Sequence, residues 1–139
     1  MKNLYIIGNW KMNKTQKETE AFFEGLLPNF NMKTKNKVVI CPPYLSIEKA
    51  SILASGTPIE IGAQNVSVDN GGLLTGEVNA DMLNEVGAKY VIVGHSSRRT
   101  ELNETNEQIN KKIIASIEAG LIPVLCVGEN KKEHELGRT

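Results

Sequence analysis

Five apolar runs of strand length are spaced along the chain. They cover positions 4–7, 38–41, 59–63, 90–93 and 121–127, and Gly, Pro, Asn or His follows each within two residues. The runs are nearly continuous in apolar residues and do not alternate with polar ones. Such runs are typical of parallel strands that are covered on both faces. We therefore expect five parallel strands.

Helical patterns separate these runs, and two of the helices begin with a capping box. Thr15 with Glu18, and Thr105 with Gln108, have the spacing at which each side chain bonds the other residue's backbone N–H. The helix after Thr105 also has an isoleucine at every fourth position, which predicts the face that packs on the strands. These positions are Ile109, Ile113 and Ile117.

Glycines mark the expected ends of the helices. A second helix is expected at about 45–54 before Gly56, and a third from Asn79 to the residues before Gly87. Gly120 ends the fourth helix. Glycine readily adopts the left-handed conformation that commonly follows a helix.

Strands that alternate with helices predict an α/β fold with a parallel sheet. Periodicity alone leaves an open, doubly wound sheet and part of a barrel as alternatives. The first turn between strand and helix, residues 8–13, reads GNWKMN and lacks the glycine-rich dinucleotide fingerprint. This weighs against a dinucleotide-binding sheet. No linker or shift in composition divides the 139 residues, so we expect a single domain over 1–139.

Composition excludes several classes of partner. The 16 basic and 16 acidic side chains cancel, and no basic cluster is interleaved with aromatic residues, so we expect neither nucleic acid nor an anionic membrane as a partner. The first apolar run is too short for a signal peptide or a membrane span, which makes the cytoplasm the expected location. Cys41 and Cys126 lie inside apolar runs, as expected of reduced, buried thiols.

Polar residues follow the strands at the edge where ligands bind in parallel α/β folds. Singly, each has an ordinary structural explanation, such as a solvated lysine or a turn-capping asparagine. Together they bring a cation, amides and an imidazole to one edge, which predicts a site for a small molecule. They are Asn9, Lys11, Gln64, Asn65, His95, Ser96, Ser97, Gly128 and Glu129.

Five motifs, in order, resemble the triosephosphate isomerase family. They read GNWKMN at 8–13, GAQNV at 62–66, TGE at 75–77, VGHS at 93–96 with Arg98 and Arg99, and LCVGE at 125–129. The resemblance covers the whole chain. It implies a parallel (β/α) barrel of the triosephosphate isomerase type, with strands 1–5 and helices 1–4 present as an incomplete barrel. It also implies a homodimer, no cofactor and no metal.

The resemblance implies an isomerase that interconverts dihydroxyacetone phosphate and D-glyceraldehyde 3-phosphate through an enediolate, in glycolysis and gluconeogenesis. Lys11 would place a positive charge beside the oxyanion and the phosphate, and Asn9 would donate a hydrogen bond to a substrate oxygen. His95 would polarise the carbonyl as a neutral imidazole. The segment 75–77, with Thr75, Gly76 and Glu77, would enter the partner subunit near Asn9 and Lys11.

Other matched positions are expected to support the site without reacting. They are Ser96, Ser97, Cys126 and Glu129, with Arg98, Arg99 and Glu104 in packing and ion-pair roles. Ser97 stands where the family has a glutamate. A carboxylate near His95 and Lys11 is therefore missing, and we expect Lys11 to be held less firmly.

The resemblance ends after five strands, whereas a full barrel needs about 250 residues. The family's glutamate base, its lid and its phosphate-binding loops have no counterpart in the 139 residues, so we expect this chain alone to be inactive. The alternative is a non-catalytic half-barrel that serves as an association or binding module. Another sugar-phosphate barrel enzyme would share the architecture but would not require this set of motifs.

Overall fold

The computed structural model describes residues 4–69 and 71–138; positions 1–3, 70 and 139 of the expected domain lie outside the described residues. Five parallel strands pair in the order β1-β2-β3-β4-β5. They are β1 Tyr5–Asn9, β2 Lys37–Cys41, β3 Ile59–Ala63, β4 Tyr90–Val93 and β5 Ile122–Leu125. Each strand pairs with the next in sequence, without the reversal of order that defines a doubly wound sheet. This order confirms an incomplete barrel.

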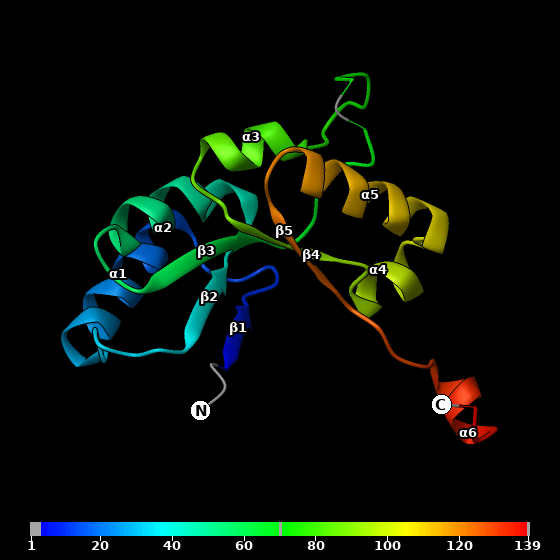
Figure 1. Ribbon diagram of the computed structural model, residues 1–139, viewed down its shortest axis with the longest axis horizontal. Helices are drawn as coiled ribbons and strands as arrows, with labels where there is room; N and C mark the ends of the chain where they lie inside the picture. Colours follow the sequence, from blue (N-terminus) through cyan, green and yellow to red (C-terminus); the bar gives the residue numbers. More distant parts are fainter. Residues whose placement is uncertain (1–3, 70, 139) are drawn as a thin grey trace.

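Helices connect the strands. They are α1 Gln16–Leu26, α2 Ile47–Ala54, α3 Ala80–Glu85, α4 Ser96–Glu101, α5 Asn106–Glu118 and α6 Lys131–Glu135, with 3-10 turns at Leu27–Asn29 and Tyr44–Ser46. Helices α1, α2, α3 and α5 lie along one side of the curled sheet, whereas α6 stands apart near the C-terminus (Figure 1). The four helices expected from the sequence are α1, α2, α3 and α5. The short helix α6 was not among them. In the described part of the chain, no helix has the length and apolar character needed to cross a membrane.

The predicted helix ends are confirmed. Both capping boxes form at the starts of α1 and α5, and Asn79 caps α3 by accepting a hydrogen bond from Met82 N–H. Gly56, Gly87 and Gly120 have φ angles of 75°, 88° and 82°. These angles lie in the left-handed region that glycine enters at little cost.

Two apolar clusters lie on opposite faces of the sheet. Val91 and Val93 of β4 join the larger cluster, which the helices cover. Tyr90 and Ile92 point to the other face and join a smaller cluster with Val39 and Cys41. Successive residues of a strand point to opposite faces, so β4 is buried on both sides, as its continuous apolar run predicts.

The expectation that all five strands are covered on both faces is wrong for the two edge strands. Tyr5 and Ile6 of β1 are 61% and 53% exposed, and Ile122 of β5 is 50% exposed. Coverage on both faces therefore applies to the inner strands and not to β1 and β5. The bounds also differ, because β1 extends to Asn9 and β5 ends at Leu125, leaving Val127 exposed.

Two predictions of burial were partly wrong. Ile109 is buried, but Ile117 is 60% exposed, and the buried stripe of α5 runs instead through Lys112 and Ser116. An α-helix has 3.6 residues per turn, so each step of four residues rotates the side chain by about 40° away from the first. Cys126 is half-buried, whereas Cys41 is fully buried as expected.

Candidate active site at the carboxyl ends of the strands

The loop after β1 holds Lys11 in an unusual backbone conformation. Lys11 has a φ angle of 53°, in the left-handed region that residues with a side chain rarely adopt. Its backbone N–H donates to Asn9 Oδ1 at 2.9 Å, and its carbonyl oxygen accepts from Gln64 Nε2 at 2.9 Å. Both polar groups of the Lys11 backbone are thus bonded to side chains. The loop presents the exposed lysine in one backbone conformation.

The two ends of the Asn9 side-chain amide have different roles. Its carbonyl oxygen accepts the bond from Lys11 N–H, which leaves the NH₂ group as the part that can donate to a ligand. The expected donor role of Asn9 toward a substrate oxygen is compatible with this orientation.

Gln64 holds the strand ends at the candidate site, a role that the sequence did not predict. Its Nε2 donates both to Lys11 O and to Cys41 O, each at 2.9 Å, while Trp10 N–H donates to the same Cys41 carbonyl at 3.1 Å. Gln64 therefore ties the ends of β1, β2 and β3 together. The sequence signals were its position directly after a strand and its place in the GAQNV motif at 62–66.

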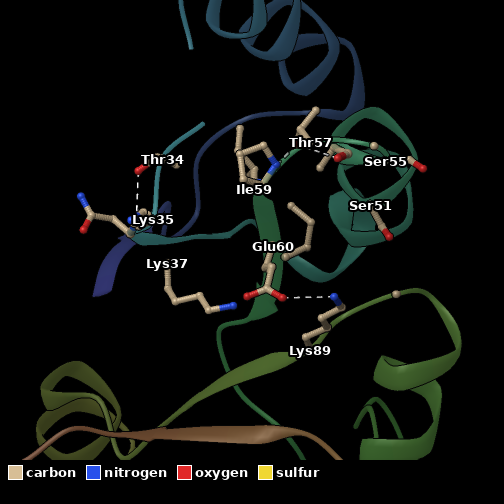
Figure 2. Close-up of a pocket in the computed structure, with 15 residues that line it drawn as sticks. Thr34, Lys35, Lys37, Ser51, Ser55, Thr57, Ile59, Glu60 and Lys89 are labelled. Carbon is tan, nitrogen blue, oxygen red and sulfur yellow. Dashed lines mark hydrogen bonds and ion pairs between the residues drawn. The ribbon is translucent and has the colours of Figure 1, made fainter. Parts of the chain in front are cut away.

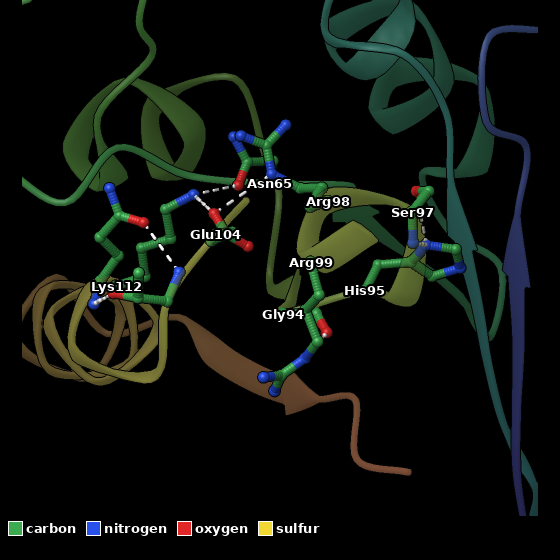
Figure 3. Close-up of polar contacts among 10 residues, drawn as sticks. Asn65, Gly94, His95, Ser97, Arg98, Arg99, Glu104 and Lys112 are labelled. Atoms are coloured by element: carbon green, nitrogen blue, oxygen red, sulfur yellow. Dashed lines mark hydrogen bonds and ion pairs between the residues drawn. The ribbon is translucent and has the colours of Figure 1, made fainter. Parts of the chain in front are cut away.

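His95 follows β4 and forms the N-cap of α4. Its Nδ1 accepts a hydrogen bond from Ser97 N–H at 3.2 Å, and Ser97 Oγ lies 2.8 Å from the same atom (Figure 3). A nitrogen that accepts from a backbone N–H carries no proton itself. The neutral ring therefore has its proton on Nε2, where it can donate to a ligand. Ser96 begins α4, and its carbonyl accepts from Thr100 Oγ1.

Arg99 fixes the segment that carries His95. Its Nε donates to Gly94 O at 2.7 Å, and its two terminal nitrogens donate to Cys126 O and to Asn106 Oδ1. Gly94 has a φ angle of 71°, and a Cβ at this position would lie 2.9 Å from Arg99 Nη2. The ends of β4 and β5 are thus joined around a glycine that leaves room for the guanidinium group.

A buried ion cluster lies behind this segment (Figure 3). Glu104 pairs with Arg98 at 3.2 Å and with the buried Lys112, whose Nζ also donates to Asn65 Oδ1 at 2.7 Å. Burial acts to raise the pKa of Glu104, but the hydrogen bonds and charges of Lys112 and Arg98 together outweigh it, so the pKa is lowered. Burial lowers the pKa of Lys112, although Glu104 opposes this. The cluster joins α5 to α4 and to the loop after β3.

Cys126 and Glu129 follow β5. Burial raises the pKa of the Cys126 thiol, although the charge of Arg99 opposes this, so the group is a poor nucleophile at neutral pH. Glu129 Oε1 lies 3.1 Å from His134 Nδ1. Glu129 is therefore engaged with the last turn of α6.

Thr75, Gly76 and Glu77 lie in the loop between β3 and α3, which extends beyond α3 and α5 in Figure 1. Leu73 and Leu74, just before them, are 85% and 51% exposed. A cavity of about 360 Å³ lies between this loop and α4 and α5. The loop thus presents apolar side chains to its surroundings.

The larger cavity of the described residues does not coincide with this site. It has about 440 Å³ and lies at the amino ends of β2, β3 and β4, opposite Asn9, Lys11 and His95 (Figure 2). Glu60 in its wall accepts from Lys89 Nζ at 3.1 Å and from Tyr90 OH at 3.0 Å. The one carboxylate among the described residues of its wall is thus already bonded within the protein, whereas the residues that the motifs name lie at the carboxyl edge.

Comparisons with known proteins agree with the motifs. A family model described as triosephosphate isomerase matches residues 4–139. Proteins named triosephosphate isomerase from Aquifex aeolicus, Synechocystis and Dictyoglomus thermophilum are 47%, 43% and 45% identical to the chain. The matches cover 96%, 100% and 100% of this chain but 54%, 58% and 56% of those proteins. The chain thus spans about half the length of these curated relatives.

Proposed function

The chain belongs to the triosephosphate isomerase family, and we propose that it carries the electrophilic half of an active site that interconverts dihydroxyacetone phosphate and D-glyceraldehyde 3-phosphate. The observation that carries this proposal is the arrangement of two donors. Lys11 is fixed in a left-handed backbone by Asn9 and Gln64, and His95 is fixed with its proton on Nε2.

The reaction moves a proton between two neighbouring carbons. A base removes a proton from the carbon beside the carbonyl, and the carbonyl oxygen becomes an enediolate oxygen. The proton of the neighbouring hydroxyl passes to that oxygen, and the base returns its proton to the carbon that carried the carbonyl, so that hydroxyl and carbonyl exchange places. His95 Nε2–H and the Asn9 NH₂ group donate to the oxygens on which negative charge develops. Lys11 supplies a positive charge to these oxygens and to the phosphate. Fixed donors of this kind stabilise the transition state because they need not reorient when the charge appears.

The glutamate base that the family resemblance implies is not among the 139 residues, so the activity proposed here is that of the whole protein. A general base contributes about 100- to 10,000-fold to the rate. We propose that the 139-residue chain by itself does not isomerise triose phosphates at a useful rate.

The proposal includes a homodimer in the cytoplasm, with no cofactor, no nucleic acid and no membrane partner. The exposed Leu73 and Leu74 beside Thr75 support a dimer loop, because exposed apolar side chains are typical of interfaces. The balance of acidic and basic residues supports the exclusion of nucleic acid.

The test is the rate of triose phosphate isomerisation by the protein as it is encoded, compared with its Lys11→Met variant. We expect turnover in the wild type and a fall in kcat/KM of about 100-fold or more in the variant. Lys17→Met is the matched control, since Lys17 is exposed on α1 away from the strand ends. A well-folded wild type without turnover would favour the non-catalytic half-barrel, for which the exposed β1 and β5 edges are the support.

A further inference from the structure

Ser97 makes a contact with His95 that a glutamate at this position could not make. Two groups of Ser97 approach His95 Nδ1, the backbone N–H at 3.2 Å and the hydroxyl oxygen at 2.8 Å. The backbone N–H can only donate, so Nδ1 accepts. The hydroxyl must then turn its own hydrogen toward Nδ1. An ionised carboxylate has no hydrogen to donate and would leave Nδ1 with the backbone bond alone.

We propose that Ser97 is a positioning residue for His95, whose hydroxyl donates a second hydrogen bond to Nδ1 and holds the ring with its proton on Nε2. This inference rests on the proposed function, in which Nε2–H is the group that faces the substrate. The sequence showed only that the serine removes a carboxylate from this position. In this inference the serine also adds a hydrogen bond to His95 Nδ1.

The two arginines of α4 do not compete for Nδ1. Arg98 is paired with Glu104, and the guanidinium group of Arg99 donates to Gly94 O, Cys126 O and Asn106. Figure 3 shows both arginine side chains turned away from the imidazole, with Ser97 beside it. Ser97 is therefore the residue of α4 that determines which ring nitrogen of His95 carries the proton.

The size of the effect follows from the exposure of the pair. His95 is half-buried and Ser97 is exposed, so water can partly replace the lost hydroxyl. We expect removal of the hydroxyl to lower kcat about two- to tenfold. KM should stay within about twofold, because the hydroxyl does not itself touch substrate.

The experiment compares Ser97→Ala with Ser97→Thr, which keeps a hydroxyl at the same place. Both are made in the protein as it is encoded. The readouts are kcat, KM and the ¹⁵N resonances of the His95 ring, assigned by comparison with His95→Gln. Thr100→Val is the matched control, because it removes another exposed hydroxyl from α4 that bonds the Ser96 carbonyl and not the imidazole. Alanine has the highest helix propensity, so Ser97→Ala should fold.

The expected result is an unprotonated, hydrogen-bonded Nδ1 in the wild type and in Ser97→Thr. In Ser97→Ala, the Nδ1 resonance should move toward that of an unbonded ring nitrogen, with the fall in kcat. A protonated Nδ1 in the wild type, or an unchanged Nδ1 resonance in Ser97→Ala, would overturn the proposal. A wild type without isomerase activity would instead refute the proposed function, while the ¹⁵N spectra would still decide whether the hydroxyl bond exists.

Discussion

At the scale of single residues, Lys11 shows how the site is held before a substrate arrives. A side chain in the left-handed backbone region costs roughly 1–2 kcal/mol, so it persists only where neighbours stabilise it. Here Asn9 bonds the N–H of Lys11 and Gln64 bonds its carbonyl. The bond from Asn13 Nδ2 to Trp10 O, at 2.7 Å, holds the same loop.

Gln64→Glu tests this support. The substitution keeps the shape of the side chain but places a carboxylate oxygen against the carbonyls of Lys11 and Cys41, which repel it. We expect kcat/KM for isomerisation to fall about tenfold or more, since one charge-stabilising group is released from its position. Gln108→Glu is the matched control, because Gln108 uses only its oxygen, as an acceptor from Thr105 N–H. Equal kinetics in the two variants would show that Gln64 does not position Lys11.

Motifs name Asn9, Lys11 and His95 in the sequence, and the structure has Asn9 at the end of β1 and the other two just after β1 and β4; their roles in the reaction stay a prediction. The hydrogen bonds that hold these residues in place could not be predicted from the sequence. The role of Gln64 depends on carbonyls at the ends of two other strands, and the role of the Ser97 hydroxyl depends on the direction of a backbone N–H. Neither relation is a property of sequence spacing.

At the scale of elements, the loop from β4 into α4 depends on Gly94. A Cβ added there would meet Arg99 Nη2 and Ile109 Cδ1, both at 2.9 Å, in a backbone with φ of 71°. We expect Gly94→Ala to lower the free energy of unfolding by about 2–4 kcal/mol, from backbone strain and overpacking. Gly25→Ala in α1 meets nothing within 4 Å and should raise it by about 0.5–1 kcal/mol. Urea titration of both variants measures the change in the free energy of unfolding. Equal changes in the two variants would contradict the prediction.

The pair of Glu104 and Lys112 makes the attachment of α5 sensitive to acid. The pKa of Glu104 is lowered from its ordinary value of 4.5, so its contribution is complete above that value and is lost as pH falls through the lowered one. Protonation then leaves Lys112 buried without its partner. We expect Glu104→Gln to be less stable than the wild type at pH 7, with the difference shrinking below about pH 4.5.

The free energy of unfolding, measured by urea titration at several pH values, checks this prediction. Glu118→Gln is the control, since Glu118 is exposed at the end of α5. A difference between wild type and Glu104→Gln that did not change with pH would contradict the assignment.

Elements were predicted best where a local signal fixes them. Capping boxes and glycines placed the helix ends because these interactions lie within a few residues of one another. The exposure of Ile117 was mispredicted because a four-residue spacing drifts around a helix of 3.6 residues per turn. The exposure of β1 was mispredicted because it depends on which elements lie alongside. Local sequence does not contain that information.

At the scale of the whole molecule, the half-barrel has two open edges. The backbone of β1 and of β5 each pairs with one neighbour, and apolar side chains of both strands are exposed. Unpaired edges with apolar side chains favour association with other strands. The strand order agrees with the barrel that the motifs imply.

We therefore expect the isolated 139-residue chain to associate or to be poorly soluble. Light scattering coupled to size-exclusion chromatography measures this directly. A monomer that unfolds in one cooperative transition would contradict it. The intact mass of the endogenous protein is a companion measurement, since a complete barrel of about 250 residues has about 27 kDa.

The central claim is that His95 donates from Nε2 to the oxygen that becomes charged during isomerisation. The most direct measurement is kcat for triose phosphate isomerisation by the protein as it is encoded and by its His95→Gln variant. We expect a fall in kcat of about 100-fold, because glutamine does not reproduce the fixed N–H direction of the capped ring. A His95→Gln variant with the kcat of the wild type would contradict it.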